Sequence, residues 1–181
     1  NNEIKKLEKE IDTYLGIDTT AVVTNGTIAM QLAMRALDLH EGEVITTPFS
    51  WVANCNAIQW ERCQPVFVDV DPESFNINPD EIEAAITKRT RAILGVHVFS
   101  CPCDVERIEA IASAHNLRVI YDGAHAFGVK YNNKSVFSWG DISTTSFHAT
   151  KLFNTCEGGA VFTSRSLKER IKSLRFFGID S

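Results

Sequence analysis

Apolar residues along the chain fall into two alternating patterns. Recurrence every three or four positions is typical of a helix with one buried face, and a short continuous run, as at 65–70, is typical of a buried strand. Helices are therefore predicted at 4–15, 28–39, 52–60, from 79 onward, at 105–112 and at 166–175, and strands at 20–24, 44–47, 65–70, 91–98, 117–121, 141–147 and 160–163. This alternation predicts an α/β fold of three layers (α/β/α), with helices on both faces of a mostly parallel sheet.

Local signals indicate where several helices begin. Asn78 before Pro79 is a strong helix start, with asparagine as the cap and proline in the first turn. We also expect Ser50 to cap the helix that follows it, and Ser166, together with Glu169, to cap the last helix.

The length of 181 residues suits one ordinary domain, and the net charge of −5 argues against nonspecific binding to nucleic acid or to an anionic membrane. No apolar run approaches the roughly 20 residues that span a bilayer. The charged first segment is unlike a signal peptide, and the five cysteines form no disulfide or zinc pattern. We therefore expect a cytoplasmic protein with free thiols and no bound metal.

Position 1 is not methionine and a helical pattern is already under way there, so we expect that the sequence is cut at both ends.

A lysine lies in the loop between the last two predicted strands. The strands at 141–147 and 160–163 are expected to pair around Lys151 and to hold its loop rigid while the ammonium stays reachable. Partial desolvation in such a loop favours the neutral amine, which can attack a carbonyl. The alternative is an ordinary solvated lysine, and this loop alone does not decide between the two.

Other polar and aromatic residues stand where predicted strands end. The dipeptide Gly26-Thr27 joins a strand to a helix, and the free amides of such a junction favour a phosphate, although a simple turn and cap gives the same signal. Trp51 follows a second strand, where α/β folds place ligands; the alternative is a packing aromatic. Asp122 ends a third strand and Ser146 ends a fourth.

Together these residues predict a cofactor. The aldehyde of pyridoxal 5′-phosphate forms a Schiff base with a lysine, its ring stacks on an aromatic side chain, its ring nitrogen pairs with a carboxylate, and its phosphate binds amides and hydroxyls. Each assignment is weak alone, but the set is difficult to explain by packing. The sequence therefore predicts pyridoxal phosphate as the cofactor, with Lys151 and Asp122 as catalytic residues.

Five motifs stand in order along the chain: NGT at 25–27, TPFSW at 47–51, PVFVD at 65–69, YDGAHAFG at 121–128 and SFHATK at 146–151. They resemble the DegT/DnrJ/StrS aminotransferases, which are fold-type I pyridoxal-phosphate enzymes acting on nucleotide-linked keto-sugars. The resemblance covers essentially the whole chain. Within that family the chain is most similar to the transaminases that make dTDP-4-amino-4,6-dideoxyglucose, through the segments 103–108 and 153–159.

The resemblance implies a role for each candidate. Lys151 would bind the cofactor covalently and then carry a proton between the amino-acid Cα and the cofactor. Asp122 would keep the ring nitrogen protonated. The remaining cofactor-binding residues implied are Trp51 and His125 against the ring, and Gly26, Thr27 and Ser146 at the phosphate.

The resemblance also implies the reaction and the partners. An amino donor, expected to be L-glutamate, supplies an amino group that passes to a nucleotide-linked keto-sugar such as dTDP-4-keto-6-deoxyglucose. Lysine at position 151, where some relatives carry histidine, favours transamination over removal of a hydroxyl. Family members are homodimers with a shared active site. The chain, residues 1–181, is expected to be the cofactor-binding large domain of such an enzyme, without the C-terminal small domain.

Three positions depart from the family pattern. Gly123 stands where alanine is common and is expected to add flexibility beside Asp122. Cys156 replaces a frequent glycine, and we expect a mild effect because cysteine is small and buries well. Phe177 stands where many relatives place a histidine.

The remaining histidines and tryptophans have simpler interpretations. His97 is expected in the core and His115 at the surface, while His148 is open between a structural and a functional role. Trp60 and Trp139 are expected to pack.

Two other classes of protein compete with the enzyme. A non-catalytic regulator or binding protein on the same fold stays open, although Lys151 and Asp122 argue against it. A nucleotide-binding α/β domain is disfavoured, because Gly-x-Gly-x-x-Gly and Gly-x-x-x-x-Gly-Lys are both absent.

Overall fold

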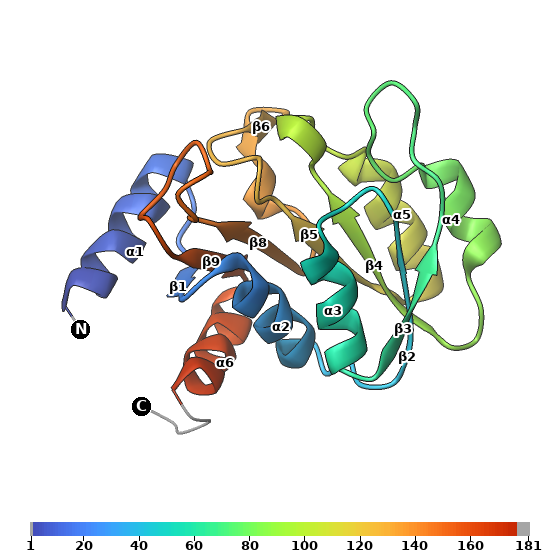
Figure 1. Ribbon diagram of the computed structural model, residues 1–181, viewed down its shortest axis with the longest axis horizontal. Coiled ribbons are helices and arrows are strands. Elements are labelled where there is room, and N and C mark those ends of the chain that lie inside the picture. The colour runs from blue at the N-terminus through green and yellow to red at the C-terminus, as the bar shows by residue number, and fades with distance from the viewer. Residues whose placement is uncertain (1, 177–181) are drawn as a thin grey trace.

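The central sheet has seven strands in the order β1-β9-β8-β5-β4-β2-β3 (Figure 1). The computed structural model describes residues 2–176. Neighbouring strands are parallel except at β9, which is antiparallel to both β1 and β8. The strands of this sheet are β1 (Thr20–Val23), β2 (Gly42–Thr46), β3 (Cys63–Phe67), β4 (Thr90–Val96), β5 (Arg118–Asp122), β8 (Ile142–Ser146) and β9 (Gly159–Thr163); β6 (Lys130–Tyr131) and β7 (Lys134–Ser135) form a separate small hairpin.

The helices lie in two layers, one on each face of the sheet. One apolar core contains residues of α2, α3 and α6, and the cores on the opposite face contain residues of α1, α4 and α5. This arrangement confirms the predicted three-layer α/β fold. The helices are α1 (Asn2–Leu15), α2 (Gly26–Ala36), α3 (Val52–Trp60), α4 (Pro79–Ala85), α5 (Val105–His115) and α6 (Arg165–Arg175), with 3-10 turns at η1 (Val98–Ser100) and η2 (Val136–Ser138).

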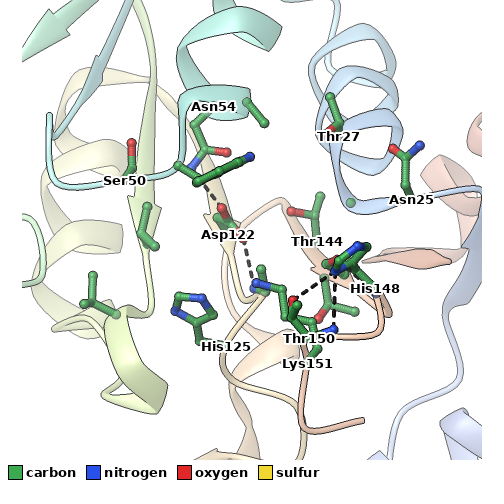
Figure 2. Close-up of a pocket in the computed structure, with 18 of the residues that line it drawn as sticks. Asn25, Thr27, Ser50, Asn54, Asp122, His125, Thr144, His148, Thr150 and Lys151 are labelled. Atoms are coloured by element: carbon green, nitrogen blue, oxygen red, sulfur yellow. Dashed lines mark hydrogen bonds between the residues drawn. The ribbon is translucent and has the colours of Figure 1, made fainter. Parts of the chain in front are cut away.

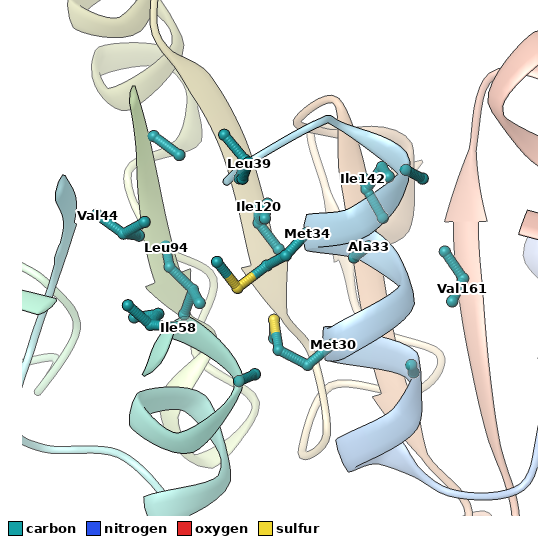
Figure 3. Close-up of a cluster of buried hydrophobic side chains, with 14 of the residues drawn as sticks. Met30, Ala33, Met34, Leu39, Val44, Ile58, Leu94, Ile120, Ile142 and Val161 are labelled. Carbon is teal, nitrogen blue, oxygen red and sulfur yellow. The ribbon is translucent and has the colours of Figure 1, made fainter. Parts of the chain in front are cut away.

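Helix α2 packs on the middle of the sheet. Met30, Ala33 and Met34 lie on one side of the helix at helical spacing and face Leu94 and Ile120 of the sheet (Figure 3). The two methionines, Leu94 and Ile120 are fully buried. Burial of a side chain of this size contributes about 1.5–3 kcal/mol. This packing fixes the axis of α2, and therefore the place where the helix begins.

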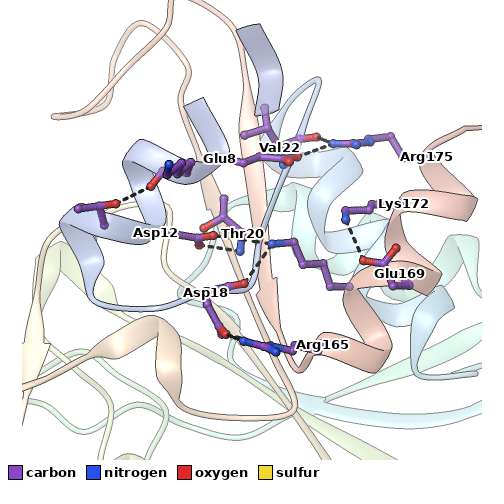
Figure 4. A network of polar contacts seen from close by, with 12 residues as sticks. Glu8, Asp12, Asp18, Thr20, Val22, Arg165, Glu169, Lys172 and Arg175 are labelled. Carbon is purple, nitrogen blue, oxygen red and sulfur yellow. Dashed lines mark hydrogen bonds and ion pairs between the residues drawn. The ribbon is translucent and has the colours of Figure 1, made fainter. Parts of the chain in front are cut away.

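The open edge of β1 is covered by side chains of α1. The backbone N–H groups of Thr20 and Val22 point away from β9 and donate to Asp12 Oδ1 at 2.9 Å and to Glu8 Oε1 at 3.0 Å (Figure 4). Arg175 of α6 also contacts Glu8, with Nη1 2.9 Å from Oε1. The carboxylates therefore satisfy an edge that would otherwise be free to pair with another chain.

Two of the expected helix caps are wrong and one is confirmed. Asn78 accepts a hydrogen bond from the N–H of Asp80, as expected for the start of α4. Ser50 instead donates to the carbonyl of Thr47, and α3 starts after Trp51 without a side-chain cap. The last helix begins earlier than expected, because Ser164, not Ser166, is in the extended conformation and accepts from the N–H of Leu167.

The segment expected as a buried strand at 65–70 is an edge strand. β3 covers Cys63–Phe67 and pairs with β2 alone, at the end of the sheet. Its burial is accordingly incomplete, and Phe67 is 51% exposed. An apolar run does not show whether a strand has one neighbour or two, so the sequence could not distinguish these cases.

The other histidines and tryptophans mostly match their simple interpretations. His97 is fully buried, and His115 is exposed and lies near Glu83. Trp139 packs against Tyr131 in the core around α5, whereas Trp60 is 54% exposed and does not pack as expected.

Within residues 2–176, no helix has both the length and the apolar character that crossing a membrane requires. The same residues contain no cluster of three or more histidine, cysteine or acidic side chains arranged for a metal ion. All five cysteines are free thiols.

Burial makes His97 a source of acid sensitivity. Its Nδ1 accepts the N–H of Cys103 at 3.0 Å, and its ring stacks on Tyr121. Desolvation lowers the pKa of His97 from 6.5 to about 4. Because the folded form stays neutral while the unfolded chain takes up a proton, the stability contributed by His97 is complete above pH 6.5 and is lost as the pH falls toward 4.

We expect the free energy of unfolding to fall by about 2 kcal/mol between pH 7 and pH 5 through His97 alone. The variant His97→Asn keeps an acceptor for the N–H of Cys103 and removes the titrating group. Urea denaturation at the two pH values should therefore show a smaller loss for the variant than for the wild type. Equal losses in both proteins would contradict this explanation.

Candidate active site

A cavity of about 710 Å³ lies at the carboxyl ends of β4, β5 and β8 and at the beginnings of α2 and α3. This is where parallel α/β sheets bind ligands. The structure brings all seven predicted site residues to its wall: Gly26, Thr27, Trp51, Asp122, His125, Ser146 and Lys151. Figure 2 labels four of them, Thr27, Asp122, His125 and Lys151.

The start of α2 presents free amides to the cavity. Asn25 caps the helix by accepting from the N–H of Ile28 at 2.8 Å, and within residues 2–176 no acceptor faces the N–H groups of Gly26 and Thr27. A Cβ on Gly26 would lie 2.9 Å from Ser146 Cβ, so glycine permits the helix to begin directly against the end of β8. The Ser146 hydroxyl is thereby placed beside the positive end of the helix dipole. Such an arrangement suits an anion.

Asp122 is held from three sides at the end of β5. Its carboxylate accepts from Asn54 Nδ2 and from the N–H of Ala124, both at 2.9 Å. Its carbonyl accepts from the N–H of His97 at 2.9 Å. The sequence interpretation missed Asn54. The available signal was its position in the first turn of the helix that follows Trp51.

The loop that carries Lys151 is closed at its base, as predicted from the pairing of β8 with β9. Phe147 donates its N–H to the carbonyl of Gly158 at 2.8 Å and accepts from the N–H of Thr155 at 3.0 Å. The buried ring of Phe147 anchors this base. Lys151 is half-buried and lines the cavity.

His148 supports the turn just before the lysine. Its carbonyl accepts the N–H of Lys151 at 2.9 Å, and its Nδ1 lies 2.9 Å from Thr150 Oγ1. Its Nε2 faces Glu157 Oε1 at 3.7 Å across the loop. These contacts favour a structural role for His148 at the rim of the cavity.

Two rings complete the rim. Trp51 is 76% exposed above the cavity, so it is not a packing residue within this chain. His125 lies parallel to Phe99, with ring centroids 6.0 Å apart, and the Ser100 hydroxyl donates to its carbonyl. Partial burial and the nearby charge of Lys151 lower the pKa of His125, while Asp122 opposes that shift. The charges of Lys151 and Asp122 therefore act on His125 in opposite directions.

The structure gives Gly123 a steric role, contradicts the burial expected of Cys156, and leaves Phe177 undescribed. Gly123 is required for space, because a Cβ would lie 2.4 Å from Phe137 Cε1. Cys156 is exposed, and its φ of 65° is a conformation that favours glycine, so it is neither buried nor without strain. Phe177 lies outside the described residues.

We expect Gly123→Ala to destabilise the protein by about 1–3 kcal/mol, since the added methyl group meets a ring that is itself fixed by stacking on Phe162. Urea denaturation measures the change. Adding Phe137→Leu should return part of the stability by removing the obstructing ring edge. A Gly123→Ala variant as stable as the wild type would contradict the steric explanation.

Comparisons with known proteins identify the family of the chain. The model of the DegT/DnrJ/EryC1/StrS aminotransferase family matches residues 1–181. A dTDP-4-amino-4,6-dideoxy-D-glucose transaminase of Shigella dysenteriae is 49% identical over 175 residues, which are 96% of this chain and 47% of that protein. The chain therefore spans about half the length of the curated relatives that it matches.

Solved structures show the same fold. The structure of DesI in the presence of its TDP-sugar product superposes with a TM-score of 0.95 at 36% identity, covering 99% of this chain and 46% of that one. NtdA from Bacillus subtilis, with its cofactor PMP bound, superposes with a TM-score of 0.92 at 33% identity, covering 98% and 40%. Since the family model matches the chain from end to end, the chain belongs to the DegT/DnrJ/EryC1/StrS aminotransferase family.

Proposed function

We propose that the protein is a pyridoxal-phosphate-dependent aminotransferase, and that this chain is its cofactor-binding large domain. The observation that carries the proposal is the meeting of Lys151, Asp122 and the free amides of α2 on one cavity. The proposed amino donor is L-glutamate. The proposed acceptor is a nucleotide-linked keto-deoxysugar such as dTDP-4-keto-6-deoxyglucose, supported by the Shigella relative.

The residues present fit the cofactor. Free N–H groups at Gly26 and Thr27 and the hydroxyl of Ser146 suit its phosphate. Trp51 offers an exposed flat face for the ring, and Asp122 offers a carboxylate fixed by two hydrogen bonds. His125 would lie against the ring.

When bound, pyridoxal phosphate supplies an electron-accepting ring that stabilises negative charge on the α-carbon of an amino acid. Lys151 Nζ would hold the cofactor through its aldehyde carbon, and once released it would carry the proton of the amino-acid α-carbon to that former aldehyde carbon. Asp122 would keep the ring nitrogen protonated, because a negative charge favours the protonated form of a nearby base. The hydrogen bonds that close the base of the Lys151 loop would limit how far the lysine moves.

The proposed substrate also gives a reason for a second copy of the protein at the active site. A nucleotide-linked sugar carries a diphosphate, and Lys151 is the one lysine or arginine among the described residues that line the cavity. We propose that a second copy of the protein supplies further cations in a homodimer with a shared active site, together with the substrate-binding small domain. A phosphate-rich ligand needs such groups for charge-assisted hydrogen bonds.

The test uses absorption spectra, borohydride and a peptide map. Pyridoxal phosphate added to the full-length protein should give the absorption band of a lysine-bound cofactor, and reduction should label Lys151. L-Glutamate should remove that band, and a dTDP-linked 4-keto-6-deoxysugar should restore it. If Lys151 is not labelled, the aminotransferase proposal is wrong, and a non-catalytic protein on this fold becomes the better interpretation.

A further inference from the structure

Asn54 is a polar side chain buried in the first turn of α3. It is 2% exposed, and its Nδ2 lies 2.9 Å from Asp122 Oδ2 (Figure 2). A carboxylate only accepts hydrogen bonds when ionised, so the amide nitrogen and not the oxygen must face it. Within residues 2–176, no other side chain donates to Asp122.

The two donors to Asp122 come from different parts of the chain. The N–H of Ala124 belongs to the turn that follows Asp122 itself, so it moves together with that residue. Asn54 belongs to α3, and among the described residues it alone ties the carboxylate to another element. Trp51 is the residue directly before this helix, and its carbonyl accepts the N–H of Asn54 at 3.1 Å. The start of α3 therefore links the exposed ring above the cavity to the carboxylate in its wall.

We propose that Asn54 is a positioning residue, which holds the Asp122 carboxylate in one orientation and couples it to Trp51. This inference rests on the proposed function, in which Asp122 and Trp51 contact the cofactor. Without Asn54, one carboxylate oxygen would lose its fixed partner and the group could rotate. An aspartate at position 54 would place two carboxylates at hydrogen-bond distance, where like charges disfavour ionisation of both.

The experiment compares Asn54→Ala and Asn54→Asp with the wild type in the full-length protein. Equilibrium dialysis gives the Kd for pyridoxal phosphate, and steady-state kinetics give kcat and KM for L-glutamate. We expect Asn54→Ala to weaken cofactor binding about 10-fold and to lower kcat about 10-fold, with KM changing less than about twofold. Asn54→Asp, which keeps the shape of the side chain, should weaken binding about 100-fold.

Asn56 provides the matched control on the same helix. It is half-buried, and its side chain makes no hydrogen bond within the described part of the chain. Asn56→Ala and Asn56→Asp should leave the Kd and kcat near the wild-type values. If they weaken cofactor binding as much as the changes at Asn54, general loosening of α3 is the cause and the inference is overturned.

A double-mutant cycle with Asp122→Ala separates positioning from a general structural effect. If Asn54 acts through Asp122, adding Asn54→Ala to Asp122→Ala should change the Kd by less than about twofold. A full 10-fold further loss would overturn the inference, as would single variants that bind with the wild-type Kd. Borohydride labelling of Lys151 in the wild type tests the proposed function separately, because it does not depend on position 54.

Discussion

Lys151→Ala is expected to abolish covalent attachment of the cofactor and to lower kcat by about 10⁵-fold. The change removes both the amine that binds the aldehyde and the base that carries the proton, and no other lysine among the described residues lines the cavity. The contacts at α2 and Asp122 remain, so the variant should still bind pyridoxal phosphate without a covalent bond. Mass spectrometry after borohydride reduction, combined with a transamination assay, measures both effects.

Lys130→Ala is the control for this prediction. Lys130 is exposed in the β6–β7 hairpin and does not line the cavity. Its replacement should leave labelling and kcat near the wild-type values. Undiminished labelling of the Lys151→Ala protein would show that another residue binds the cofactor, and the assignment of Lys151 would then be wrong.

Asp122→Asn is expected to lower kcat by about 10³-fold while the protein stays folded. The amide has the shape of the carboxylate but lacks the charge that favours a proton on the cofactor's ring nitrogen. Asn54 Nδ2 and the N–H of Ala124 would then face a side chain that accepts through one atom only. The half-reaction with L-glutamate, followed by absorption spectroscopy, measures the loss directly.

Asp141→Asn offers a matched comparison at the amino-terminal end of β8, opposite the end that faces the cavity. Asp141 precedes β8 and binds the N–H of Val119 and the guanidinium of Arg118, away from the cavity. Its replacement should lower the free energy of unfolding and leave kcat nearly unchanged. If Asp122→Asn behaved in the same way, the carboxylate of Asp122 would have a structural role and not a catalytic one.

Much of the site could be predicted from the sequence because of where parallel strands end. Alternating helices and strands imply a sheet whose carboxyl edge collects the residues that follow each strand. Asp122 and Ser146 are the last residues of β5 and β8, Lys151 lies in the loop after β8, and Gly26 begins α2 shortly after β1. Their meeting on one cavity therefore follows from local patterns and the rules of topology.

The tertiary structure alone decided which groups touch across that edge. Asn54 reaches Asp122 only because the first turn of α3 lies at the carboxyl end of β5, a contact between residues 68 positions apart. Gly123 is needed because Phe137, brought from a later turn, occupies the space of its missing side chain. β3 lies at the edge because β4 pairs with the other side of β2 and not with β3. Local periodicity determines what an element is and roughly where it ends, whereas neighbours distant in the chain determine what each side chain meets.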